Sequence, residues 1–167
     1  GGDTNGDGSA TTPAPGDWGY IKINGSNNTL ENCIIKYGGL RDDNDNYYYE
    51  TWHNYMVWVY DVDPAISIIN CTLSNAYEWG IRYDANTGNN TSPLISGNTI
   101  TGCPKGIYIT GSIDHTTATI SNNSMLSLSI EGIYCKELAH STISNNSISG
   151  GSGYGIYCNG IASSSVV

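Results

Sequence analysis

The segments that decide the fold are LENCII at residues 30–35, IINCTL at 68–73, ISGNTI at 95–100, ISNNSM at 120–125 and ISNNSI at 143–148. They align without a gap. The first and sixth positions are apolar in all five, the third is Asn or Gly, and the fourth is Cys or Asn. Their starts are separated by 38, 27, 25 and 23 residues. Self-similarity at such a period is the signature of a repeat protein.

A second segment recurs about 12 residues after the start of most of these. It reads GIRY at 80–83, GIYI at 106–109 and GIYC at both 132–135 and 155–158, with IKI at 21–23 and VWV at 57–59 as earlier copies. Apolar and polar or aromatic residues alternate in each copy, which is typical of a half-buried β-strand. Each repeat therefore contains several short strands.

Short strands at a period of about 25, separated by Asn and Gly corners, predict an all-β fold in which each repeat is one coil of a parallel β-solenoid. We expect about six coils. An inward ladder of Asn98, Asn123 and Asn146 should hydrogen-bond along the stack, with Cys33 and Cys71 continuing the row as small apolar residues. The alternative is an antiparallel β-sandwich with Asn-rich turns, but hairpins do not require in-register similarity at the length of a coil.

The chain resembles the right-handed parallel β-helix repeat proteins that bacteria secrete, in the broad pectin-lyase-like group. The resemblance lies in GDTNGDG at 2–8, PAPGDWG at 13–19 and NCIIKYGG at 32–39, and it covers nearly the whole chain. It implies a right-handed helix and a secreted or cell-surface location. It is weak for function, because the group contains enzymes, adhesins and structural proteins.

Composition limits the partners. Lys and Arg number 6 against 15 Asp and Glu, a net charge of −9, which argues against nucleic acid and anionic membranes as partners. No apolar run is long enough to span a bilayer. We expect two regions: a polar entry segment at residues 1–17, and a β-helix at 18–167 that carries an insertion at 40–55.

The insertion makes the first step between repeats longer than the others. It combines acids with aromatic residues, among them Tyr48 and Trp52. One interpretation is a glycan-binding loop, in which aromatic rings stack on sugars and carboxylates bind hydroxyls. The alternative is a lid that covers the flank of the helix.

The outward positions of the alternating strands should form one stripe along the stack. They are Lys22, Trp58, Arg82, Tyr108, Tyr134 and Tyr157. In pectin-lyase-like proteins ligand grooves commonly run along such a face, which makes the stripe a candidate binding site. The alternative is that stacked aromatic rings only stabilise parallel in-register strands.

The case for catalysis is thin. The stripe contains no Asp or Glu, although Asp61, Asp63 and Asp84 follow strands and could converge near Arg82. A hydrolase needs two carboxylates across a cleft. A lyase of the pectin-lyase-like group would need a calcium cluster of carboxylates and a nearby basic residue. Activity as a polysaccharide lyase or glycoside hydrolase is therefore the less favoured expectation.

The opening Asp3-Thr-Asn5-Gly-Asp7-Gly matches the first half of an EF-hand-type loop. Asp3, Asn5 and Asp7 could bind calcium, although the twelfth position is Ala14 and not a carboxylate. The alternative is a polar, turn-rich entry strand. We expect no other cofactor.

The five cysteines show no CxxC and no metal-ligand spacing, and we expect them to be buried and mostly reduced. Val166 stands where a sixth hexamer would begin, so we expect either a longer protein or a second subunit that completes the coil. Together these patterns predict a non-catalytic extracellular structural or adhesive β-helix that stacks end to end with copies of itself into a filament. The alternative is a β-helix that binds or cleaves carbohydrate.

Overall fold

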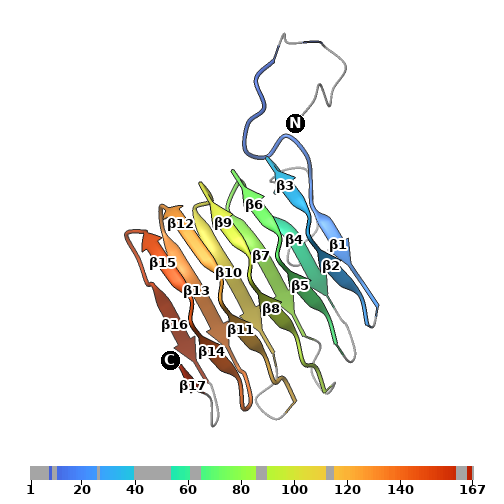
Figure 1. The fold of residues 1–167 in the computed structure, drawn as a ribbon, viewed down its shortest axis with the longest axis vertical. Helices are drawn as coiled ribbons and strands as arrows, with labels where there is room; N and C mark the ends of the chain where they lie inside the picture. Colours follow the sequence, from blue (N-terminus) through green and yellow to red (C-terminus); the bar gives the residue numbers. More distant parts are fainter. Residues whose placement is uncertain are drawn as a thin grey trace, which may run out of the picture.

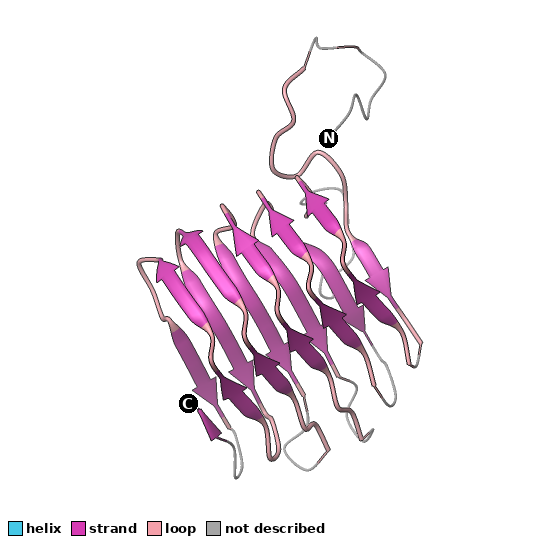
Figure 2. Ribbon diagram, viewed as in Figure 1, coloured by secondary structure: helices cyan, strands magenta, loops and turns pink. Residues whose placement is uncertain are grey.

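The computed structural model of the chain describes residues 8, 11–25, 27–39, 54–60, 65–85, 90–111, 115–160 and 165–166. Every regular element in these residues is a β-strand, and they contain no helix long and apolar enough to cross a membrane (Figure 2). The strands repeat in threes along the chain, and Figure 1 shows the resulting coils following one another from the blue end to the red end. The prediction of an all-β parallel solenoid is confirmed.

Three parallel sheets run the length of the stack. The first sheet has six strands: β1 (Ile21–Ile23), β4 (Tyr55–Tyr60), β7 (Trp79–Asp84), β10 (Lys105–Thr110), β13 (Glu131–Lys136) and β16 (Ile156–Asn159). The second sheet also has six: β2 (Thr29–Glu31), β5 (Ser67–Ile69), β8 (Leu94–Ser96), β11 (Thr119–Ser121), β14 (Thr142–Ser144) and β17 (Ser165–Val166). The third has five: β3 (Ile34–Lys36), β6 (Thr72–Ser74), β9 (Thr99–Thr101), β12 (Ser124–Leu128) and β15 (Ser147–Gly150).

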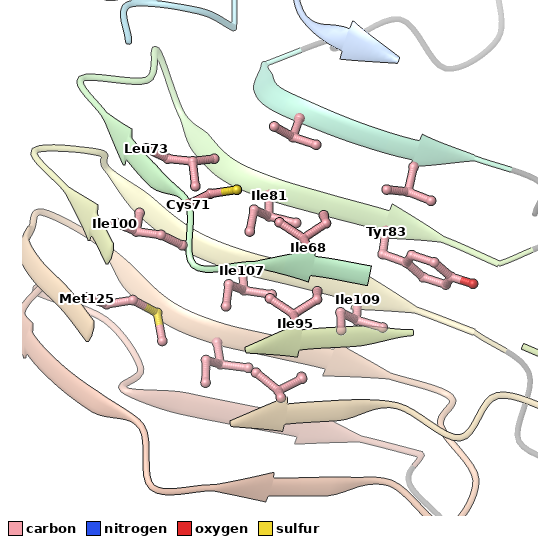
Figure 3. Close-up of a cluster of buried hydrophobic side chains, with 14 of the residues drawn as sticks. Ile68, Cys71, Leu73, Ile81, Tyr83, Ile95, Ile100, Ile107, Ile109 and Met125 are labelled. Atoms are coloured by element: carbon pink, nitrogen blue, oxygen red, sulfur yellow. The ribbon is translucent and has the colours of Figure 1, made fainter. Parts of the chain in front are cut away.

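The core is a column of stacked apolar side chains between the three sheets. Figure 3 shows residues of the first sheet, such as Ile81 and Ile107, facing residues of the second and third, such as Ile95 and Ile100. All four are at most 1% exposed. The alternation in the sequence explains this placement, because in a strand every second side chain points to the same face.

The corner between the second and third sheets explains the repeated Asn in the hexamers. The third hexamer position has a positive φ in all five coils: 56° at Asn32, 53° at Asn70, 69° at Gly97, 56° at Asn122 and 55° at Asn145. Asn and Gly are the residues that tolerate this left-handed conformation at low cost. The corner therefore selects these residue types wherever it recurs.

The fourth hexamer position carries a hydrogen-bonded ladder. Asn123 Oδ1 accepts from the backbone N–H and the Nδ2 of Asn98, both at 3.0 Å, and Asn123 Nδ2 donates to Ile95 O at 2.9 Å. Asn146 makes the same bonds to the coil of Asn123, and Asn98 Oδ1 accepts from Cys71 N at 2.9 Å. Each Asn side chain thus satisfies backbone groups of the coil before it.

The first and last cysteines of the chain lie nearer to solvent than the sequence suggested. All five cysteines are free thiols, with Cys71, Cys103 and Cys135 buried and Cys33 and Cys158 half-buried. Cys33 lies in the first coil and Cys158 in β16, so among the described residues each has a neighbouring coil on one side only.

The entry segment reaches the stack just before β1. Trp18 packs on the core and donates from Nε1 to Lys36 O at 2.7 Å, while Gly16 N donates to Tyr37 O at 3.0 Å. The expected insertion runs from residue 40 to residue 55. Its residues 40–53 lie outside the described residues, and its last residue, Tyr55, is the first residue of β4.

Candidate functional site

The outer face of the first sheet gathers most of the aromatic and basic side chains of the described chain. Strand pairing places one residue from each coil opposite the next: Lys22 with Trp58, Trp58 with Arg82, Arg82 with Tyr108, Tyr108 with Tyr134, and Tyr134 with Tyr157. We call these six residues the central row. They are the outward residues of the alternating strands.

The three tyrosines of the central row stack ring on ring. The centroids of Tyr108 and Tyr134 lie 5.1 Å apart with an interplanar angle of 14°, and those of Tyr134 and Tyr157 lie 4.8 Å apart at 27°. Each ring plane therefore faces along the stack, and the ring faces of Tyr134 are covered on both sides. What this part of the row turns to solvent is ring edges and hydroxyl groups.

Arg82 interrupts the aromatic rings and holds the centre of the row. Its guanidinium carbon lies 5.0 Å from the ring centroid of Tyr108 and 5.3 Å from that of Tyr55, both within cation–π range. Its Nε donates to Asp84 Oδ2 at 2.7 Å. Burial alone would lower the pKa of Arg82, but the hydrogen bond and charge of Asp84 outweigh it and raise that pKa. The guanidinium therefore stays charged.

Asp84 joins two members of the central row from the end of β7. The same Oδ2 atom that accepts from Arg82 also accepts from Trp58 Nε1 at 2.8 Å. The residue is 9% exposed, and its Oδ1 is one of the buried side-chain atoms of the described chain that has no hydrogen-bond partner. Asp84 fixes Trp58 against Arg82, and so ties β4 to β7 through side chains.

The flanking charges of the face form local pairs. Lys105 Nζ lies 2.7 Å from Glu78 Oε1 and 4.9 Å from the ring centroid of Trp79. Lys22 Nζ lies 4.5 Å above the Trp58 ring. Glu78 thus neutralises Lys105 and Asp84 neutralises Arg82 within the face, whereas Lys22 lies over an aromatic ring.

The predicted site residues divide into two groups. Trp58, Arg82, Tyr108, Tyr134 and Tyr157 lie together in the central row. Tyr48 and Trp52 of the insertion, the calcium candidates Asp3, Asn5 and Asp7, and the acids Asp61 and Asp63 lie outside the described residues. Among the residues that the structure does describe, no three His, Cys, Asp or Glu side chains form a metal-binding group.

The sequence reasoning missed three contributors to the face: Tyr55, Trp79 and Lys105. Tyr55 pairs with Trp79, and Trp79 pairs with Lys105, so they form a second row beside the central one. Their signal was present in the sequence, because each stands three residues before a member of the central row. Two successive buried positions, such as Met56 and Val57, separate the two rows, so a search for strict alternation did not find the second row.

One comparison with known proteins agrees with this architecture. A family described as the right-handed beta helix region matches residues 56–167, more than half of the chain. The comparison with curated proteins and the comparison with solved structures find no match. The matched residues contain the coils from β4 onward, with their stacked rows and Asn ladder. The chain therefore belongs to the right-handed β-helix family.

Proposed function

We propose that this chain is a non-catalytic, extracellular structural or adhesive β-helix module that assembles end to end with copies of itself. One observation carries the proposal: the side chains of the central row make their contacts with side chains of the neighbouring coils. Tyr108 and Tyr134 cover one another at 5.1 Å, and Arg82 covers Tyr108 at 5.0 Å. A face arranged in this way stabilises coil against coil, and the same contacts suit the joining of one stack to another.

The two end strands of the first sheet offer matching surfaces for such a joint. Ile156 of β16 pairs with the fully buried Ile133 but is itself 38% exposed, so an apolar position of the core row lies open there. At the other end, Ile21, Ile23 and Leu30 line a hollow of about 270 Å³. Docking of one end on the other would cover both apolar surfaces and add β16 to β1 as neighbouring parallel strands.

The test compares two lysine substitutions at sites of similar exposure. Ile156→Lys places a charge in the proposed joint, whereas Leu126→Lys changes an outward residue of β12, which is 41% exposed and lies in an inner coil. Sedimentation velocity and negative-stain microscopy across a salt series should show filaments for the wild type and for Leu126→Lys, and monomers for Ile156→Lys. Salt should promote assembly, because it screens the repulsion between chains of charge −9.

Two outcomes would contradict end-to-end assembly. One is a wild-type chain that stays monomeric at every salt concentration, and the other is equal assembly by Ile156→Lys. Repeating the series with a calcium chelator tests whether calcium at Asp3, Asn5 and Asp7 orders the entry segment for docking. Loss of assembly in chelator alone would support that role.

The second candidate function is the binding of a neutral glycan at the C-terminal end of the central row, beside Tyr157. Tyr154 is 57% exposed, and its ring lies 4.9 Å from that of Tyr157, which leaves aromatic surface that a sugar could stack on. Cleavage of the glycan is less favoured, because the central acid of the face, Asp84, is held by Trp58 and Arg82. A glycan array should lose signal with Tyr154→Ala and keep it with Tyr77→Ala, an exposed tyrosine outside the row.

A further inference from the structure

A series of aromatic rings in contact leads from a buried ring of the first sheet to an exposed ring beside β16. The ring centroids lie 5.3 Å apart from Trp79 to Tyr108, 5.1 Å from Tyr108 to Tyr134, 4.8 Å from Tyr134 to Tyr157 and 4.9 Å from Tyr157 to Tyr154. We call these five residues the ring series. Trp79 is 8% exposed, whereas Tyr154 is 57% exposed. The ring series therefore joins a buried ring to solvent.

The side chains of the ring series are of the two types that lose an electron most readily among aromatic residues. Indole and phenol give up one electron more easily than the ring of Phe. Centroid separations of about 4.5–7 Å are typical of aromatic rings in contact, and every step of the ring series falls within this range. Electron transfer is fast between π systems in contact, so an electron vacancy created on one ring can move to the next.

The positive charges of the face favour movement of the vacancy toward Tyr154. At the other end of the ring series, Lys105 Nζ lies 4.9 Å from the ring centroid of Trp79, and the guanidinium carbon of Arg82 lies 5.0 Å from that of Tyr108. A positive charge beside a ring opposes the loss of an electron from that ring, although the acidic partner of each base offsets part of the charge. Within the described residues, the three rings that follow Tyr108 in the series make no cation–π contact.

The loss of the phenol proton favours the same end of the series. An oxidised phenol persists as a neutral radical only after its hydroxyl group has released a proton. Burial raises the pKa of Tyr108, so this hydroxyl group holds its proton firmly. Tyr154 is exposed to water, which can accept the proton. We therefore expect the radical to settle at Tyr154.

We propose that Tyr154 is a site of oxidative cross-linking, at which two chains join through a dityrosine bond. A one-electron oxidant, such as the high-valent haem of a peroxidase or a photogenerated Ru(III) complex, takes one electron from each ring series, and each Tyr154 releases its hydroxyl proton to water. The two phenoxyl radicals form one carbon–carbon bond between ring positions next to the hydroxyl groups. The hydrogen atoms at these positions then move to the oxygens and restore both phenols. Each cross-link therefore costs two electrons and two protons in total.

Stacking opposes the same reaction between neighbours inside the row. The new bond must lie in the plane of both rings, whereas Tyr134 meets Tyr108 and Tyr157 face to face, at interplanar angles of 14° and 27°. Tyr154 lies at the end of the series, tilted by 42° against Tyr157, and turns more than half of its surface to solvent. The ring of Tyr154 can therefore meet a second chain.

Two other exposed tyrosines show what exposure alone would predict. Tyr77 is 43% exposed and makes no ring contact among the described residues. Tyr60 is 41% exposed, and its ring lies 5.0 Å from that of Trp58 and 5.4 Å from Lys22 Nζ. If exposure decided the site of coupling, both would react about as readily as Tyr154. The ring series predicts a clear preference for Tyr154.

The test oxidises the full-length chain with photogenerated Ru(III) tris(bipyridine), with persulfate as the final electron acceptor. Low salt leaves the repulsion between chains of charge −9 unscreened, which separates this reaction from the end-to-end assembly proposed above. Dimers are counted on reducing gels, which remove disulfides, and the dityrosine bond is mapped by mass spectrometry. Among the 13 tyrosines, Tyr154 should dominate the cross-links between chains.

Three variants separate the ring series from exposure. Tyr154→Phe should abolish the dominant cross-link. Tyr157→Phe keeps a ring at its place but cannot carry the vacancy, so the yield at Tyr154 should fall several-fold although Tyr154 itself is unchanged. Tyr77→Phe removes an exposed phenol outside the ring series and should leave the yield at Tyr154 as in the wild type. Each variant loses one hydroxyl group from a ring that is exposed or half-buried and should fold, which circular dichroism checks.

The proposal fails on any of three results. The first is a spread of cross-links over the exposed tyrosines without preference for Tyr154. The second is an unchanged yield at Tyr154 in Tyr157→Phe, which would leave exposure as the only cause. The third is a bond between Tyr154 and Tyr157 of the same chain in place of a bond between chains.

Discussion

Replacement of Asn123 by Leu tests the ladder at its middle. The side chain is 1% exposed and takes part in four hydrogen bonds: Oδ1 accepts twice from Asn98, and Nδ2 donates to Ile95 O and to Asn146 Oδ1. Leu has a similar volume but makes none of them. Asn98 Nδ2 retains Ile68 O, and Asn146 Oδ1 retains the backbone N–H of Asn123.

Two groups then lose their Asn123 partner inside the core: the backbone N–H of Asn98 and the carbonyl of Ile95. A buried polar group left without a partner costs about 1–3 kcal/mol. We therefore expect Asn123→Leu to lower the free energy of unfolding by about 4 kcal/mol, a large share of the roughly 5–15 kcal/mol that holds a domain together.

The assay is urea denaturation followed by circular dichroism, with two graded controls. Asn146→Leu should cost less, because Asn146 is half-buried and water can replace part of its bonding. Asn159→Leu, an exposed position at the end of β16, should change the free energy of unfolding by less than about 0.5 kcal/mol. Equal midpoints for Asn123→Leu and Asn159→Leu would refute the reasoning. A variant too unstable to purify would agree with its direction.

Three further perturbations address the central row and the cysteines Cys135 and Cys158, which face each other in the pairing of β13 with β16. Tyr134→Ala removes two ring stacks, each worth about 0.5–1.5 kcal/mol, and should lower the free energy of unfolding by at least about 1–3 kcal/mol in urea, whereas Tyr134→Phe should stay near the wild type. Asp84→Ala leaves Arg82 without its carboxylate and should destabilise the fold by about 2 kcal/mol, with a shift in tryptophan fluorescence that Asp84→Asn only partly shows. Alkylation of Cys158 should rise through pH about 7, because the bond from Cys135 lowers its pKa, and Cys135→Ala should move that midpoint to higher pH. If Cys135→Ala left the pH dependence of Cys158 alkylation unchanged, Cys135 would not be the cause of the lowered pKa.

The coil architecture could be predicted because the corner between the second and third sheets accepts few residue types. A left-handed conformation at the third hexamer position, as at Asn70 and Asn122, tolerates few residue types, and the neighbouring inward position must bond to the adjacent coil. Both requirements recur in every coil, so they leave a visible repeat. The register of the first sheet followed from the same repeat, and the pairing of Tyr108 with Tyr134 could be read from it.

The details of the outer face could not be read in this way. Whether stacked tyrosines offer their faces or their edges to solvent depends on side-chain rotation, which residue spacing does not specify. The meeting of Trp58, Arg82 and Asp84 depends on how side chains of neighbouring strands lean. The glycine that opens each GIRY, GIYI and GIYC segment was visible in the sequence, but its reason was not. A Cβ on Gly106 would lie 2.5 Å from Gly132 O, so the close approach of the coils requires glycine there.

The Asn ladder also gives the stack a direction. Each Asn side chain bonds to the backbone of the coil before it: Asn123 completes the corner of Asn98, and Asn146 completes that of Asn123. A coil therefore reaches its final stability only when its successor arrives, which is the order in which a ribosome delivers them. Under a mechanical load, loss of the last coil removes the Asn side chain that completes the corner of the coil before it. Peeling from the red end opens the corners one at a time, and we expect a pulled chain to lengthen in steps of one coil rather than in a single rupture.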